Sequence, residues 1–322
     1  MKTKITEMLG IEYPVLMGGL QWISRAEFVS AISNAGGLSF LTAATHPNKQ
    51  AFVDEIRKCR ALTKKPFGVN ISMLPELAPA ELTMKFVEAA IEEKIQVVET
   101  SGRDPAPLIG PLKRAGIKVI HKVTSPKHAK SAEKAGVDAV VVLGYEGAGH
   151  PGMDQVGTFV NLPKAVSAVN IPVIAAGGVC DGASLAAALI LGAEAVLMGT
   201  RFIATKECPV HDNLKNRILD ADITDTVIIQ RSIRNAFRAI KNEKALTVLE
   251  LEQAGARIED LLPHISGKLG LEAMTNGDID KAVISLGQCA GRIDSITSVF
   301  ELIPAMVSDA EMRIKNLAAR TG

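Results

Sequence analysis

Acid–base chemistry has its strongest candidate in His150, which lies in a glycine-rich run over residues 147–152. An unperturbed imidazole titrates near pH ~6.5, so it can take or give a proton at working pH. A glycine and a proline flank this histidine, so the backbone sets its position. Two roles stay open for His150: direct proton transfer, or shaping of a pocket. Tyr145 and Glu146 are second candidates for proton transfer.

The run that holds this histidine, Gly147-Ala-Gly-His-Pro-Gly152, also satisfies the pattern G-x-G-x-x-G. That pattern marks a dinucleotide-binding fold where it follows the first strand and opens a helix, and where an acidic residue ends the next strand. Here five strand–helix units come first, and the next apolar stretch ends in Ala175-Ala-Gly-Gly178. The pattern therefore does not indicate a Rossmann fold.

Two later apolar stretches, 171–178 and 193–200, also end in glycine. Glycine just past the end of a buried strand lets backbone N–H groups close on an anion. The two ends, Gly177-Gly178 and Gly199-Thr200, are typical of the phosphate cradle that barrels build after strands seven and eight.

Apolar stretches of strand length alternate with helical patterns up to about residue 205. The predicted strands are 14–17, 37–41, 66–70, 95–99, 117–121, 138–144, 171–178 and 193–200. Helical spacing is found at 26–35, 47–63, 80–93, 105–115 and 125–135. Runs rich in Val, Ile and Ala are typical of parallel strands buried on both faces. We therefore predict an α/β fold, a (β/α)8 TIM barrel over residues 1–205.

The pattern changes after residue 205. Helical patterns at 210–220, 231–241 and 246–255 predict a mainly helical subdomain over residues 206–302. We expect it to cover the open end of the barrel as a lid. Residues 303–322 are expected to form a helix that returns to the barrel.

Polar groups and glycines recur at the predicted carboxyl ends of the strands, where a barrel keeps its chemistry. FMN suits this set, with its phosphate in the cradle, its ring against the backbone of residues 17–21 and Asn70 at the ring edge. Lys122 would place positive charge near the pyrimidine side of the ring and favour the reduced state. Its neighbour His121 is expected to point the other way, because successive side chains of a strand alternate. Arg201 and Arg234 are further candidates for phosphate or nicotinamide binding.

A sugar phosphate would use the same cradle, so a non-redox alternative stays open. In it the chain is an aldolase or isomerase barrel, with Lys122 as a Schiff-base amine.

Composition sets outer limits on function. With 47% hydrophobic and 22% charged residues the chain can bury a large core, and a net charge of +1 gives no reason to expect nucleic acid or an anionic membrane as a partner. Four scattered cysteines predict neither a metal site nor a disulfide framework and favour the cytoplasm. The N-terminus lacks an apolar signal core, and no stretch is expected to span a membrane. A homodimer is compatible with the sequence.

Ordered motifs along nearly the whole chain resemble the nitronate monooxygenase family, formerly called 2-nitropropane dioxygenases. They are Met17-Gly-Gly-Leu-Gln-Trp22, Pro66-Phe-Gly-Val-Asn70, Val119-Ile-His-Lys122, Glu146-Gly-Ala-Gly-His-Pro-Gly152, Ala176-Gly-Gly178 and Met198-Gly-Thr-Arg-Phe202, with Arg231-Ser-Ile-Arg-Asn235 and Leu286-Gly-Gln288 as further matches. The superfamily also holds flavin-dependent enoyl-ACP reductases and bacterial NADH:quinone reductases.

The resemblance implies noncovalent FMN at the barrel mouth beneath a smaller helical domain. The implied FMN contacts are Leu20, Gln21, Trp22, Asn70, Lys122, Ala148, Gly149, Gly177, Gly178, Gly199 and Thr200, with Gln288 closing the site. His150 matches the histidine that many members place near the reactive face of the flavin.

The resemblance leaves the reaction open among several choices. The first is oxidation of alkyl nitronates, with FMN passing electrons to O2. The second is NADH- or NADPH-dependent reduction of a quinone, toward which the Gly-Gly-Leu-Gln-Trp and Gly-Ala-Gly-His-Pro-Gly pairing leans, and enoyl-ACP reduction is a weaker version of it. In each case the partner is a small-molecule substrate.

Overall fold

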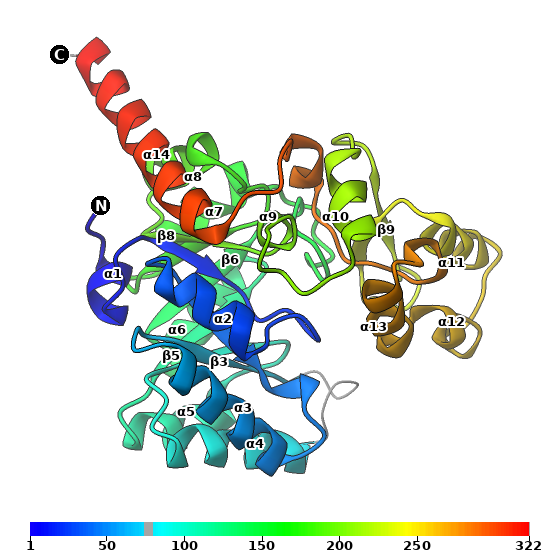
Figure 1. Cartoon of the computed structure of the whole chain (residues 1–322), viewed down its shortest axis with the longest axis horizontal. Helices are drawn as coiled ribbons and strands as arrows, with labels where there is room; N and C mark the ends of the chain where they lie inside the picture. Colours follow the sequence, from blue (N-terminus) through cyan, green and yellow to red (C-terminus); the bar gives the residue numbers. More distant parts are fainter. Residues whose placement is uncertain (74–79, 322) are drawn as a thin grey trace.

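A computed structural model describes residues 1–73 and 80–321 and contains a closed barrel of parallel strands (Figure 1). Each strand pairs with the next in sequence, and the last pairs with the first. The strands are β1 (Val15–Met17), β2 (Leu38–Thr42), β3 (Gly68–Ser72), β4 (Val97–Ser101), β5 (Lys118–Val123), β6 (Ala139–Leu143), β7 (Val173–Ala176) and β8 (Ala195–Met198). The predicted (β/α)8 barrel is confirmed.

Alternate side chains of the strands fill the barrel interior. Leu16, Phe40, Ile120 and Leu197 belong to this inner cluster, whereas their chain neighbours pack outward against the helices. Both faces are therefore apolar, which explains the continuous apolar runs in the sequence. Toward the carboxyl ends of β3, β4 and β5 the inward positions become polar, at Asn70, Glu99 and Lys122.

The barrel helices are α2 (Ala26–Asn34), α3 (Lys49–Leu62), α4 (Ala80–Glu92), α5 (Ala106–Arg114), α6 (Pro126–Ala135), α7 (Thr158–Val166) and α8 (Gly182–Ile190), with a short α9 (Thr200–Ile203) after β8 and a 3-10 turn η1 (Ala43–Thr45) after β2. Helices α2 to α6 follow the five predicted helical segments closely, and the later barrel helices had no predicted segment. An extra helix, α1 (Lys4–Leu9), places Ile5 and Leu9 in the inner cluster. It closes the end of the barrel opposite the site.

The segment after the barrel is less helical than its sequence predicts. It contains α10 (Asp212–Leu219), α11 (Glu243–Gln253), α12 (Ile258–Ile265), α13 (Gly267–Asn276), the 3-10 turns η2 (Ile279–Lys281) and η3 (Gln288–Arg292), and an antiparallel pair, β9 (Thr226–Ile229) and β10 (Phe237–Ile240). The prediction of a helix at 231–241 is wrong. Gln230 and Arg234 have positive φ in the connecting loop, which interrupts a helix, and the β-branched run at 227–229 pairs with β10 instead. The boundaries at residues 205 and 302 remain predictions.

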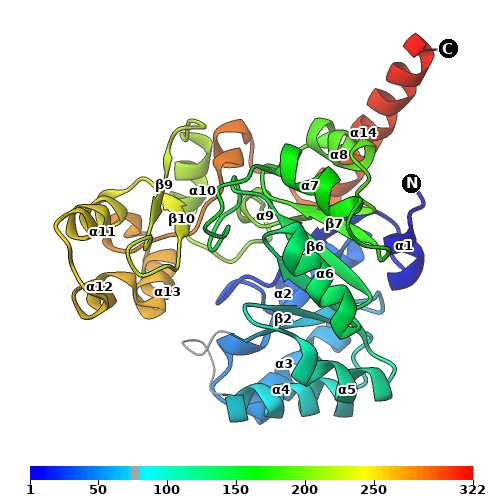
Figure 2. The same ribbon diagram turned by 180° about the vertical axis from the view of Figure 1, so that it is seen from behind.

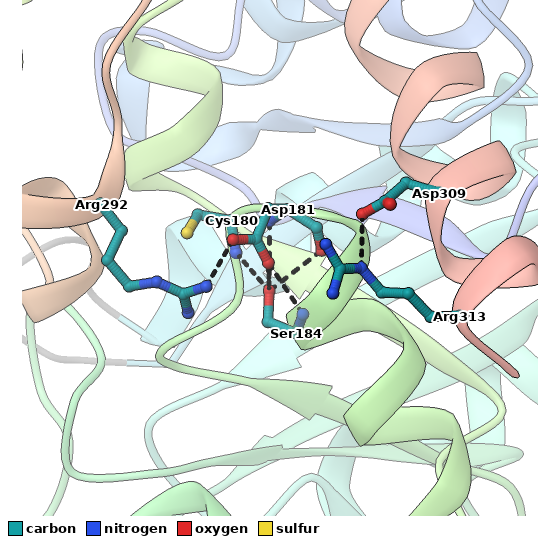
Figure 3. A network of polar contacts seen from close by, with 6 residues as sticks. All are labelled: Cys180, Asp181, Ser184, Arg292, Asp309 and Arg313. Carbon is teal, nitrogen blue, oxygen red and sulfur yellow. Dashed lines mark hydrogen bonds and ion pairs between the residues drawn. The ribbon is translucent and has the colours of Figure 1, made fainter. Parts of the chain in front are cut away.

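The last helix, α14 (Val299–Thr321), returns to the barrel and packs against α8 and α2, as expected, before its end projects from the body (Figures 1 and 2). Beside this contact Asp181 caps α8 by accepting from Ser184, and it also pairs with Arg292 of η3 (Figure 3). The start of α8 is thus held by two distant parts of the chain. Within residues 1–73 and 80–321, no helix is both long and apolar enough to cross a membrane.

Replacing Gly182 by alanine is expected to lower the free energy of unfolding by about 1–3 kcal/mol, because a Cβ there would lie 2.7 Å from the carbonyl oxygen of Met306 and 2.6 Å from Cβ of Asp309. Urea denaturation measures this loss. The matched control is Gly110→Ala in α5, where the nearest atom is the flexible guanidinium end of Arg114 at 3.3 Å. The control is expected to be neutral or to stabilise by up to ~1 kcal/mol. Equal effects of the two substitutions would contradict the close α8–α14 contact.

Candidate active site

A cavity of about 1240 Å³ opens at the carboxyl ends of the barrel strands. Its walls come from all eight strand ends and, across the mouth, from the loop before β10, from α12 and α13 and from residues 283–289. His150 and the implied FMN contacts other than Gln288 all line it, whereas two further candidates, Tyr145 and Arg201, do not. Gln288 instead donates its backbone N–H to the carbonyl of Glu146 at 3.0 Å.

The floor of the cavity is polar: Asn70 and Lys122 line it, and the fully buried Glu99 lies behind them. The carboxylate of Glu99 accepts from Nδ2 of Asn70 at 2.6 Å and lies 3.2 Å from Nζ of Lys122. It also accepts the backbone N–H of Gly19 at 3.0 Å. Asn70 of β3 pairs with Glu99 of β4, and Lys122 lies two residues after Ile120, the partner of Glu99 on β5, so the three side chains share the inward face. The sequence analysis predicted Asn70 and Lys122 as FMN contacts but did not predict that both would contact Glu99.

The loop after β1 forms one wall and approaches this floor closely. A Cβ on Gly19 would lie 2.5 Å from Cγ of Asn70, so only glycine fits. Trp22 has a positive φ of 69°, and its backbone N–H donates to Oγ1 of Thr45 at 3.0 Å. The opposite wall is near, because a Cβ on Gly267 at the start of α13 would lie 3.9 Å from atoms of Gln21 and Trp22.

The loops after β7 and β8 form the predicted cradle. Gly177 and Gly178 have φ of +87° and +77°, a backbone that L side chains rarely adopt. Gly199 precedes α9, whose first N–H groups have no partner inside the helix. Oγ1 of Thr200 accepts the N–H of Gly287 at 2.9 Å, so the cradle also contacts the C-terminal segment. Backbone N–H groups in this arrangement suit an anion.

Strand β10 fixes the loop that carries His150. Gly149 and Arg238 form an antiparallel backbone bridge, and the guanidinium of Arg238 donates to the carbonyl of Tyr145 at 2.8 and 3.0 Å. The imidazole of His150 meets the ring of Phe237 edge-on, with centroids 5.0 Å apart. The sequence missed this support because it predicted a helix at 231–241.

Glu146 has a structural role in this loop. Both of its carboxylate oxygens accept the backbone N–H of Thr158, at 3.0 and 2.9 Å, at the start of α7. A carboxylate at a helix N-terminus is favourable. Glu146 is therefore a poorer candidate for proton transfer than His150.

His121 contacts Thr100 of β4 rather than Glu99, which fits the predicted orientation opposite to Lys122, but it also lines the cavity. Its Nδ1 lies 2.8 Å from Oγ1 of Thr100, and burial lowers its pKa to about 4, so the ring is neutral near pH 7.

The expectation that Arg201 binds a phosphate or a nicotinamide is not supported. The buried guanidinium of Arg201 donates to the carbonyls of Ala204 and Ser295, at 2.9 and 2.7 Å, and so ties α9 to the C-terminal segment.

The fold and this site define a (β/α)8-barrel enzyme whose chemistry lies at the carboxyl ends of the strands. The nitronate monooxygenase family model matches residues 2–309, and the chain belongs to this family. It is a flavin-dependent oxidoreductase. This assignment excludes the aldolase alternative, and Lys122 faces a buried carboxylate instead.

Related proteins of known sequence or structure cover most of the chain. A (3aS,4S,5R,7aS)-5-hydroxy-7a-methyl-1-oxo-octahydro-1H-indene-4-carboxyl-CoA dehydrogenase of Mycobacterium tuberculosis is 35% identical, over 99% of both chains. A probable nitronate monooxygenase of Staphylococcus aureus is 32% identical, over 75% of this chain and 79% of its own. The structure of FabK from Thermotoga maritima has a TM-score of 0.90 and 36% identity over 99% of both chains. A nitroalkane oxidase of Streptomyces ansochromogenes shares the fold, with a TM-score of 0.82 at 23% identity over 96% of this chain and 99% of its own.

Proposed function

We propose that the flavin is FMN. Its phosphate would bind in the cradle formed by Gly177, Gly178, Gly199 and Thr200, and its ring would lie over the polar floor. Three features support this. Two glycines of the cradle have positive φ, and the loop after β1 approaches Asn70 so closely that only glycine fits there. The third is the charged pair of Lys122 and Glu99 at the base of the cavity. Bound FMN supplies hydride transfer. Asn70 and Lys122 would orient the ring. The segment across the mouth, which includes α12 and α13, would exclude water.

We further propose that the substrate is an acyl thioester carried on coenzyme A or on a carrier protein, with NADH or NADPH as redox partner. The observation that carries this is the size of the cavity. Small-molecule sites span roughly 300–1,000 Å³, so about 1240 Å³ holds a flavin and leaves room for a second extended ligand. The match over 99% of both chains to a carboxyl-CoA dehydrogenase and to FabK supports the same class of substrate.

Charges on the cavity wall fit an anionic carrier. Arg103 and Arg234 line the cavity, and neither makes an ion pair within the described part of the chain, whereas Lys122 does. The loop that holds Arg234 is rigid, because Glu252 accepts the N–H groups of Gln230 and Ser232 at 2.6 and 2.9 Å. The exposed guanidinium that this fixed backbone carries suits a phosphate. His150, across the mouth, is positioned to hold or move a proton on the acyl group.

Replacing Arg234 by alanine is expected to raise KM for a coenzyme A thioester about 10-fold and to leave kcat within about 3-fold, because one charge-assisted hydrogen bond is worth ~1.5–3 kcal/mol. Initial rates with crotonyl-CoA as probe measure both constants. The control is Arg257→Ala, which removes an exposed guanidinium that does not line the cavity. An unchanged KM in Arg234→Ala would contradict a role in carrier binding.

Nitronate oxidation with O2 is the second candidate. The family match and the S. aureus relatives favour it, and an alkyl nitronate would meet the same floor and the same histidine. Nitronate oxidation would not explain the size of the cavity or the presence of Arg103 and Arg234 in its wall. Quinone reduction remains a prediction that shares the nicotinamide step.

Steady-state rates separate these functions. FMN-loaded protein is expected to consume NADH or NADPH with crotonyl-CoA under argon, and to take up little O2 with propyl nitronate. Rapid O2 uptake with propyl nitronate and no turnover of crotonyl-CoA would overturn the thioester proposal in favour of nitronate oxidation. A quinone accepted in place of crotonyl-CoA would favour the quinone reductase.

A further inference from the structure

We propose that Glu99 is the positioning residue that sets the charge of the cavity floor, and that by offsetting Lys122 it lowers the reduction potential of the bound flavin. This inference rests on the proposed binding of FMN. It concerns a residue that the motifs do not single out.

Glu99 is fully buried, at 0% exposure, in the middle of β4. Its Oε2 accepts two hydrogen bonds, from the N–H of Gly19 at 3.0 Å and from Nδ2 of Asn70 at 2.6 Å. Its Oε1 lies 3.2 Å from Nζ of Lys122, within ion-pair range but outside hydrogen-bond geometry. The contact with Lys122 is therefore mainly one of charge. A buried charge is tolerated only where it is paired in this way.

The same carboxylate fixes which way Asn70 faces. A carboxylate only accepts hydrogen bonds, so the amide nitrogen of Asn70 must point to it. This leaves Oδ1 of Asn70 as an acceptor for a donor on the ligand. An imide N–H, such as the one on the pyrimidine edge of a flavin, is a donor of the required kind.

The charge argument has a definite sign. The side chain of Lys122 is 21% exposed and lines the cavity, so its ammonium acts on a ligand above it. Alone it would favour the reduced flavin, which carries negative charge near this edge. Glu99 opposes that effect from a site that solvent does not screen. Removing only the charge of Glu99 should therefore make the bound flavin easier to reduce.

The matched control is Glu93, a second buried carboxylate. Its side chain is 8% exposed and pairs with Arg57 and Arg60 at 2.8 and 2.7 Å. It lies just after α4 and does not line the cavity. Glu93→Gln reports what the loss of a buried, paired charge does to the fold without touching the floor.

The test measures dissociation constants of oxidised and reduced FMN from the apoprotein, together with the potential of the bound flavin against reference dyes. Glu99→Gln is expected to raise the ratio of oxidised to reduced dissociation constants about tenfold, which is about 30 mV more positive for a two-electron couple. Lys122→Met should shift the ratio by a similar factor the other way, and the double variant should return close to wild type. Glu99→Asp keeps the charge and should stay within about threefold, and Glu93→Gln should leave the ratio unchanged.

Several outcomes overturn the inference. One is FMN-loaded Glu99→Gln with a wild-type ratio, and another is Glu93→Gln with the same shift. If Glu99→Gln does not fold, the double variant, which removes both charges, decides by returning to the wild-type ratio or by failing to. Wild-type protein that binds no FMN would overturn the proposed cofactor as well, so the two failures are distinguishable.

Discussion

Replacing His150 by alanine is expected to lower kcat for the thioester reaction by about 10²–10⁴-fold, the usual contribution of a positioned general acid or base. The backbone bridge between Gly149 and Arg238 holds the loop independently of the imidazole, so FMN affinity should change little. Stopped-flow traces of the substrate half-reaction measure the loss, and titration with FMN checks that the site is intact.

A second variant separates proton transfer from pocket shaping. Glutamine at position 150 keeps a polar, hydrogen-bonding side chain but carries no titratable group. If His150 moves a proton, His150→Gln should be as slow as His150→Ala. A His150→Gln enzyme within a few-fold of wild type would contradict proton transfer and leave only the shaping role.

Replacing Gly19 by alanine is expected to weaken FMN binding by about 10–100-fold. The added Cβ would overlap Asn70, and relieving that overlap must displace the β1 loop or the floor at a cost of about 1–3 kcal/mol. Quenching of FMN fluorescence on binding gives the dissociation constant.

Gly270→Ala is the control for this substitution. Gly270 also lines the cavity, but a Cβ there would lie 3.9 Å from the nearest atom, the carbonyl oxygen of Val283. Its FMN affinity should stay within about threefold of wild type. If both alanine variants bind FMN equally well, the close approach of the β1 loop to the floor does not matter for the cofactor.

The barrel was predictable because its signals are local. Each strand is an apolar run that breaks at a glycine or a polar residue, and the observed strands begin and end within a few residues of those runs. The cradle glycines and the opposite orientations of His121 and Lys122 follow from the same local rules. Such features can be predicted from the sequence without knowing which distant residues make contact.

The features that the sequence missed depend on contacts far apart in the chain. In the sequence, Arg201 is a cation next to the predicted phosphate cradle. In the structure its guanidinium donates to the carbonyl of Ser295 instead. Residues 231–241 read as a helix, but β9 and the loop at Gly149 pair with them. Glu99 is the last residue of the predicted strand 95–99 and has no visible partner in the sequence, and only the closed barrel brings it to Asn70 and Lys122.

The most direct test of the account mixes FMN-loaded protein anaerobically, in separate experiments, with NADH, NADPH and propyl nitronate while the flavin absorbance is followed. One of the two nicotinamides is expected to bleach the flavin rapidly, and crotonyl-CoA added afterwards should restore the absorbance without O2. Bleaching by propyl nitronate but by neither nicotinamide, with no recovery on adding the thioester, would contradict the proposed thioester chemistry.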